Sequence, residues 1–229
     1  MKKLGIIGGM GPAATALLYK MIIDNTPAKS DQEHIPMVIL NDCLMPDRTA
    51  AILGTEEQRA AVIKKMSEDA QMLKNCGCDT MVVPCNTAHY FVDQISEKCG
   101  IRVLHMLRLT AAKAKEMAPN KKVAVLATNG TIQTGIYQKC LSEEGLTAWN
   151  PPEDIQKAVM SIIYDKVKAG QKYGPADWKA IDDAVKASGC DCAVLGCTEL
   201  SVVAKELDLP KFYIDAMEVL AEKCVEEFK

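Results

Sequence analysis

The sequence has few aromatic residues, little net charge and no long apolar run, and each shortage excludes a class of protein. Aromatic side chains make up 5% of the 229 residues, too few for the stacking platforms that bind single-stranded nucleic acids. The net charge of −3 indicates no basic surface for a nucleic acid. No apolar run approaches the roughly 20 residues that cross a bilayer. We therefore expect neither a nucleic-acid partner nor a membrane span.

The sequence also lacks the signals of secretion and of zinc binding. Glycines interrupt the short apolar segment at residues 4–9, which is typical of a first strand and not of a signal peptide. The ten cysteines are therefore expected to be reduced thiols in a cytoplasmic protein. The pairs Cys76/Cys78 and Cys190/Cys192 are C-x-C pairs, whereas structural zinc sites usually space their paired cysteines more widely. We expect no bound metal.

Apolar runs alternate with helical patterns along the whole chain, which is typical of βαβ units and parallel sheets. Thr55 and Gln58 form a capping box that predicts a helix to about Asn75. A second helical run covers 153–169, and Pro175 favours the start of a third helix. The predicted strands are Leu4–Gly8, Met37–Asn41, Thr80–Pro84, Arg102–Leu104, Lys122–Ala127, Leu146–Trp149, Cys192–Gly196 and Phe212–Ile214.

Two stretches of the chain repeat each other, and each ends in a cysteine. A Gly-Cys-Asp triplet begins at Gly77 and again at Gly189, and the cysteine follows eight residues later, at Cys85 and Cys197. Each stretch predicts a buried strand that ends in a polar turn. The flanking strands also resemble each other, so we expect an α/β fold of two four-stranded, pseudo-symmetric halves of roughly 110 residues each.

The two repeated turns carry thiols where open α/β sheets place their chemistry, at the carboxyl ends of strands. A thiol near a helix N-terminus favours the thiolate. Asn86 and Thr87 follow the first cysteine, and Thr198 and Glu199 follow the second. Two opposed thiols can remove a proton from one face of an α-carbon and return it to the other. We find no lysine motif for a pyridoxal Schiff base and expect no cofactor.

Other candidate features have a structural and a functional interpretation. The glycine turn at 8–12 is either a tight turn or an anion site, and it matches a dinucleotide fingerprint only weakly. Arg48 suits bidentate carboxylate binding but could simply pair with Asp47. Lys168, at the end of a predicted helix, could be a solvated charge. His89 either faces the site or caps its own helix.

The motifs together resemble the aspartate/glutamate racemase family, and within it the cofactor-independent aspartate racemases. The resemblance extends over essentially the whole chain. It is carried by Gly8-Gly9-Met10-Gly11-Pro12, Asp31-Gln32-Glu33-His34, Pro46-Asp47-Arg48-Thr49, Pro84-Cys85-Asn86-Thr87-Ala88-His89 and Gly196-Cys197-Thr198-Glu199. It implies racemisation by two cysteines, an active site between two lobes, and a homodimer. It also implies that the last helix packs on the first lobe, which places the lobes at 1–102 plus 215–229 and at 103–214.

The resemblance also assigns roles to single residues of this chain. Cys85 and Cys197 resemble the two acid/base catalysts of the family. Arg48 resembles the clamp for the side-chain carboxylate of the substrate, and Lys168 resembles its partner. The remaining expected substrate-binding residues are Met10, Asn86, Thr87, Thr128, Thr131, Thr198 and Glu199.

Departures from relatives narrow the expected substrate. Glutamate racemases carry an Asp-Ser turn after the first strand and a Cys-Thr-His second motif, whereas this chain has Gly8-Gly9-Met10 and Cys197-Thr198-Glu199. We therefore predict racemisation of a small-molecule substrate, aspartate, with glutamate as a second candidate. A maleate isomerase-like dicarboxylate isomerase and a non-catalytic dicarboxylate-binding protein remain the alternatives. The sequence leaves open which cysteine acts on which enantiomer.

Overall fold

The computed structural model describes residues 2–229, which divide into two compact units. Of the described residues, unit 1 comprises 2–106 and Met217–Lys229, and unit 2 comprises Leu107–Ala216. The chain changes units at the first turns of the helices α5 (Met106–Met117) and α11 (Ala216–Phe228), a few residues away from the expected lobe boundaries. No helix within the described residues is long and apolar enough to cross a membrane.

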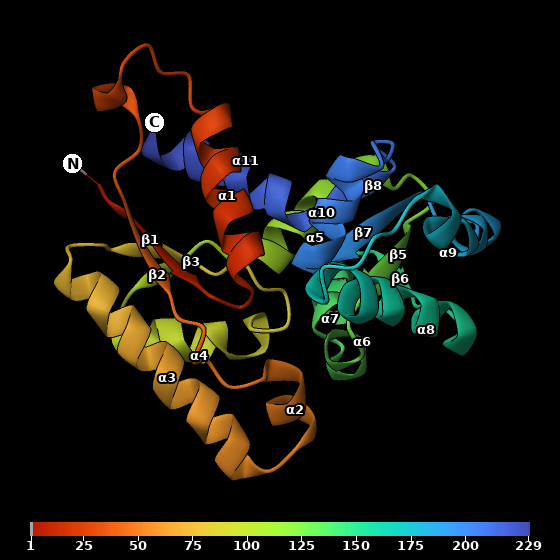
Figure 1. Cartoon of the computed structure of the whole chain (residues 1–229), viewed down its shortest axis with the longest axis horizontal. Coiled ribbons are helices and arrows are strands. Elements are labelled where there is room, and N and C mark those ends of the chain that lie inside the picture. The colour runs from red at the N-terminus through yellow and green to blue at the C-terminus, as the bar shows by residue number, and fades with distance from the viewer. Residues whose placement is uncertain (1) are drawn as a thin grey trace. The chain divides into compact units, whose positions relative to one another are not determined.

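Unit 1 is a parallel four-stranded sheet in the order β2-β1-β3-β4 with helices around it (Figure 1). The strands are β1 (Leu4–Gly8), β2 (Met37–Asn41), β3 (Thr80–Val82) and β4 (Arg102–Val103). The helices are α1 (Pro12–Asn25), η1 (Asp31–Glu33), α2 (Arg48–Leu53), α3 (Glu56–Asn75), α4 (His89–Cys99) and α11.

Unit 2 repeats this arrangement with a parallel sheet in the order β6-β5-β7-β8 (Figure 1). Its strands are β5 (Lys122–Ala127), β6 (Thr147–Trp149), β7 (Cys192–Gly196) and β8 (Tyr213–Asp215). Its helices are α5, α6 (Asn129–Thr134), α7 (Ile136–Glu143), α8 (Glu153–Ser161), η2 (Ile162–Lys168), α9 (Pro175–Ala187) and α10 (Thr198–Glu206). In both sheets the second strand along the chain lies at one edge and the fourth at the other, which confirms the predicted pseudo-symmetric α/β architecture.

Local sequence signals place most element boundaries. The capping box is present, because Thr55 accepts from the amide of Gln58 and the Gln58 side chain accepts from the amide of Thr55. Three strands shift by a single residue from the prediction: β4 ends at Val103, β6 begins at Thr147, and β8 covers Tyr213–Asp215. Two other elements differ more. Strand β3 ends at Val82, two residues before the expected Pro84, and the expected helix at 153–169 is an α-helix that continues as the π-helix η2 from Ile162 to Lys168.

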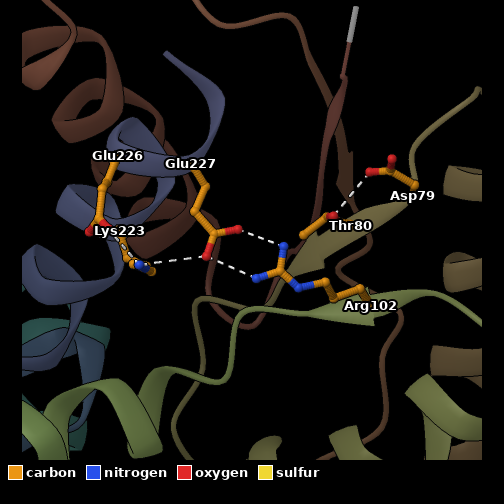
Figure 2. A network of polar contacts seen from close by, with 6 residues as sticks. All are labelled: Asp79, Thr80, Arg102, Lys223, Glu226 and Glu227. Atoms are coloured by element: carbon orange, nitrogen blue, oxygen red, sulfur yellow. Dashed lines mark hydrogen bonds and ion pairs between the residues drawn. The ribbon is translucent and has the colours of Figure 1, made fainter.

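The C-terminal helix α11 is held to the sheet of unit 1 by a bidentate ion pair (Figure 2). Arg102 Nη1 and Nη2 donate to the two carboxylate oxygens of Glu227, at 2.6 and 2.8 Å. Lys223 Nζ lies 2.8 Å from the carboxylate of Glu226 and 3.7 Å from that of Glu227. Figure 2 shows both contacts. The apolar face of the helix is buried at Leu220 and Cys224. The chain thus leaves unit 1 after β4 and returns to it with its last helix.

Candidate active site

The two repeated cysteines follow equivalent strands of the two sheets. Cys85 lies just beyond β3, and Cys197 directly follows β7, the third strand of its own unit. Only 6% of Cys85 and 7% of Cys197 is exposed. All ten cysteines are free thiols. Each unit therefore presents one buried thiol at the carboxyl end of its third strand.

The turn that carries Cys85 is separate from helix α4, which begins only at His89. The amide of Cys85 donates to the carbonyl of Val83 at 2.8 Å. Its carbonyl contacts His89 Nδ1 at 2.9 Å, and the carbonyl of Asn86 accepts from the amide of His89 at 3.0 Å. Asn86 and Thr87 are both buried in this turn. A tight turn therefore separates Cys85 from the first residue of α4.

Cys197 is the N-cap residue of α10 and contacts an acid in the first turn of that helix. Its Sγ donates to Glu199 Oε2 at 2.9 Å, and Thr198 Oγ1 lies 3.5 Å from the same oxygen. Burial raises the pKa of the Cys197 thiol well above its ordinary value, and the charge of Glu199 adds to the effect. The prediction that the helix start favours a thiolate is therefore wrong for Cys197, because desolvation and the nearby carboxylate outweigh the helix dipole.

The carboxylate of Glu199 also meets Lys168. Lys168 Nζ lies 3.5 Å from Glu199 Oε1 and 4.8 Å from the centre of the Tyr164 ring. The neighbouring Lys166 pairs instead with Asp177, at 3.6 Å. Glu199 thus contacts both Lys168 and Cys197. Lys168 is therefore not a freely solvated lysine.

Arg48 is the first residue of α2, and it does not pair with the neighbouring aspartate. Asp47 caps the helix, because its Oδ1 accepts from the amide of Ala50 at 2.6 Å. Arg48 Nη1 donates to the carbonyl of Pro46 at 3.0 Å, while Nε is buried and has no hydrogen-bond partner among the described residues. A guanidinium carries five N–H donors, and the hydrogen bonds of Arg48 to the described residues use only those of Nη1, so it retains bonding capacity for a further acceptor.

Met10 lies in the glycine turn between β1 and α1 and is 3% exposed. Gly9 has a φ of +87°, and a Cβ there would lie 2.3 Å from the backbone of Asp42. The amide of Gly9 donates to Thr15 Oγ1 at 3.0 Å, so this N–H is already hydrogen-bonded within the protein. The close approach of Gly9 to the backbone of Asp42 and the internal hydrogen bond of its amide favour the interpretation of a tight turn.

Thr128 and Thr131 are buried together at the start of α6 in unit 2. Their hydroxyl oxygens lie 3.1 Å apart, and Thr128 Oγ1 accepts from the amide of Thr131 at 3.3 Å. Asn129 and Gln156 next to them line an open hollow of about 570 Å³ in the same unit. The two threonines therefore cap the start of α6, and the hollow is lined by their neighbours.

The described residues contain no group of three or more His, Cys, Asp or Glu side chains arranged to hold a metal ion. Sequence reasoning left the contacts of His89 open and did not single out Asp69. His89 links the Cys85 turn to the amide of Met106, and the carboxyl of Asp69 is buried in the middle of α3. Both depend on contacts with residues that are distant in the sequence or on another element.

Comparisons with known proteins agree with this arrangement. Residues 7–224 match the model of the Asp/Glu/Hydantoin racemase family. A broad specificity amino-acid racemase of Bacillus subtilis, RacX, is 27% identical over 229 residues, which cover 98% of this chain and 97% of that protein. The structure of an aspartate racemase of Picrophilus torridus aligns with a TM-score of 0.78 and 29% identity, over 99% of this chain and 94% of that one. A glutamate racemase of Aquifex pyrophilus shares the fold, with a TM-score of 0.67 and 23% identity over 100% of this chain and 84% of that one. The chain belongs to the Asp/Glu/Hydantoin racemase family.

Proposed function

We propose that the protein is an amino-acid racemase that interconverts L- and D-aspartate by proton transfer at the α-carbon, with Cys85 and Cys197 as the two acid/base groups and without pyridoxal phosphate. One observation carries the proposal: each unit buries one thiol at the carboxyl end of its third strand. A protein that only binds a dicarboxylate has no need of two such thiols.

The proposed reaction needs one thiolate and one thiol at the start. The thiolate removes the α-proton from one face of the substrate, and the thiol donates its own proton to the opposite face of the carbanion. The roles are then exchanged, so the reverse reaction starts from the other enantiomer. The raised pKa and the hydrogen bond to Glu199 support Cys197 as the group that begins as the thiol. Cys85 then begins as the base.

The carboxylates of the substrate require cationic and hydrogen-bonding partners. Arg48 retains a buried Nε without a described partner, which supports its role as a clamp for the side-chain carboxylate. Lys168 belongs to the second cysteine turn through its pair with Glu199. We assign the α-carboxylate and ammonium groups to Asn86, Thr87 and Thr198, and the walls of the site to Met10, Thr128 and Thr131.

The relatives support aspartate as the first substrate to test and a wider range as the second. The Picrophilus torridus protein is an aspartate racemase by name, and the Bacillus subtilis relative is named for broad specificity. Glutamate, which is one methylene longer than aspartate, is the natural comparison. A hydrophobic pocket discriminates one methylene by only about 1–3 kcal/mol, so activity on both acids is compatible with one site.

The test is to incubate the purified, reduced protein with L-aspartate or L-glutamate in deuterated water. Chiral chromatography follows the D-enantiomer, and NMR follows deuterium at the α-carbon. Cys85→Ser and Cys197→Ser should each lower kcat by about a thousandfold or more, because a serine hydroxyl is a far weaker acid than a thiol. Cys78→Ser and Cys140→Ser, which replace buried cysteines of the same two units, are the matched controls. Full activity in either catalytic variant would contradict the two-thiol mechanism.

A further inference from the structure

His89 holds two backbone groups that belong to different elements. It is the first residue of α4 and is 4% exposed. Its Nδ1 lies 2.9 Å from the carbonyl oxygen of Cys85, and its Nε2 accepts from the amide of Met106 at 3.1 Å. Met106 begins α5, at the point where the chain passes from unit 1 to unit 2. The imidazole thus connects the Cys85 turn to the start of the next helix.

The two contacts determine which nitrogen carries the proton. A backbone amide can only donate, so Nε2 must present its lone pair to Met106. The proton of the neutral ring therefore resides on Nδ1, which donates to the carbonyl of Cys85. Because the first amides of an α-helix have no partner within the helix, His89 also satisfies a donor at the start of α5.

The carbonyl of Cys85 receives this bond in place of a regular helical one. The amide of His89 donates to Asn86, and the amide of Phe91 donates to Ala88 at 2.9 Å. These backbone bonds bypass Cys85, whose carbonyl precedes the helix. The imidazole N–H therefore replaces the missing backbone donor. It bonds the carbonyl group that is attached directly to the Cα of Cys85, from which the thiol side chain extends.

We propose that His89 is a positioning residue for Cys85: its Nδ1–H holds the Cys85 carbonyl and thereby sets the direction of the thiol toward the substrate. Neither sulfur nor substrate touches the ring in this role. The orientation of the thiol toward a substrate rests on the proposed racemase function. The influence of His89 on the surroundings of the Cys85 thiol does not depend on that function. A displacement of about 1 Å at a reacting group can cost on the order of a hundredfold in rate.

The rival role is a purely structural link between α4 and α5 through Met106. Two substitutions distinguish the two roles, because each preserves only one of the two hydrogen bonds that the imidazole makes. The amide nitrogen of asparagine falls near Nδ1, so His89→Asn keeps a donor for Cys85. The amide oxygen of glutamine falls near Nε2, so His89→Gln keeps an acceptor for Met106. His89→Leu removes both contacts.

The experiment measures three quantities for each variant: the melting temperature, kcat and KM for aspartate, and the alkylation rates of Cys85 and Cys197 by iodoacetamide, resolved by peptide mass spectrometry. We expect His89→Asn to keep kcat and the Cys85 alkylation rate within about threefold of the unsubstituted protein. We expect His89→Gln to lower kcat by about tenfold or more at little-changed KM, and to change the alkylation rate of Cys85 but not that of Cys197.

Equal kcat values and equal Cys85 alkylation rates in the asparagine and glutamine variants would overturn the proposal, as would an unchanged Cys85 alkylation rate in the glutamine variant. The comparison does not depend on His89→Leu, which can lose stability. If the unsubstituted protein racemised neither acid, the proposed function would be wrong, and the alkylation rates would still decide whether His89 controls the environment of Cys85.

Discussion

The thiol of Cys197 donates a hydrogen bond of 2.9 Å to the carboxylate of Glu199, two residues further along the chain. Cys85, by contrast, lies in a turn whose carbonyl is held by an imidazole. The two thiols thus occupy equivalent positions in the two sheets but chemically different surroundings. Burial and the carboxylate of Glu199 raise the pKa of Cys197, so this thiol favours its protonated form.

The first prediction concerns the charge of Glu199. Since this charge contributes to the raised pKa of Cys197, Glu199→Gln should lower that pKa and accelerate alkylation of Cys197 at about pH 8. If Cys197 must be protonated at the start of the reaction, its pKa sets the alkaline limb of the profile of kcat/KM against pH. This limb should therefore move to lower pH in the variant. Glu206→Gln, at the exposed end of the same helix, is the control. An unmoved alkaline limb would show that Glu199 does not act on the thiol.

The second prediction concerns substrate recognition by Arg48. Arg48→Ala should lower kcat/KM for aspartate by about a hundredfold or more, mainly through KM, because a charge-assisted bidentate contact is lost. Arg48→Lys should recover only part of the loss, since an ammonium cannot reproduce the planar fork. Arg59→Ala removes a neighbouring guanidinium that donates only to backbone carbonyls, at 2.9 and 3.2 Å, and serves as the control. Wild-type kcat/KM in Arg48→Ala would refute the clamp.

The third prediction concerns pH and a buried acid of unit 1. Asp69 is 2% exposed, and burial, with the charge of Asp42 adding to it, raises its pKa to about 6. An acid whose pKa rises on folding stabilises the folded state fully below its unfolded pKa, and this contribution is lost as the pH rises to about 6. Asp69→Asn, which resembles the protonated acid, should therefore increase the free energy of unfolding by about 2 kcal/mol at pH 7.5.

Urea denaturation across the range of about pH 4 to 8 measures this effect. The gain should disappear toward the acid end of that range, where the native carboxyl is already protonated. Glu68→Gln, an exposed neighbour on α3, should show no such dependence. A gain of the same size at both ends of the range, or a loss at pH 7.5, would contradict the raised pKa of Asp69.

The fourth prediction concerns the attachment of α11. Arg102→Ala removes a bidentate pair with Glu227 that connects the helix to β4. Because the arginine side chain is 55% exposed, the expected loss is only about 0.5–1 kcal/mol, and it should shrink in high salt. Lys20→Ala, which removes an exposed pair within α1, should cost less. Differential scanning at low and high salt distinguishes the two, and an Arg102→Ala loss that is independent of salt would contradict the ionic origin.

Much of the fold was predictable because its signals are local. Strands buried on both faces leave continuous apolar runs, so β5 and β7 could be predicted to the residue. Proline lacks an amide donor, and β3 stops before Pro84 for that reason. The transition to a π-helix at Ile162 has no comparable local signal, because an i→i+5 pattern depends on how the helix packs.

The sequence by itself determined that there are two related sheets and that each places a cysteine after its third strand, since the spacing and the strand pattern are properties of neighbouring residues. Only the tertiary structure decided what surrounds those thiols. The pair of Lys168 with Glu199 and the link from His89 to Met106 join separate helices. No local pattern encodes such contacts, because packing brings together side chains that the chain itself holds far apart.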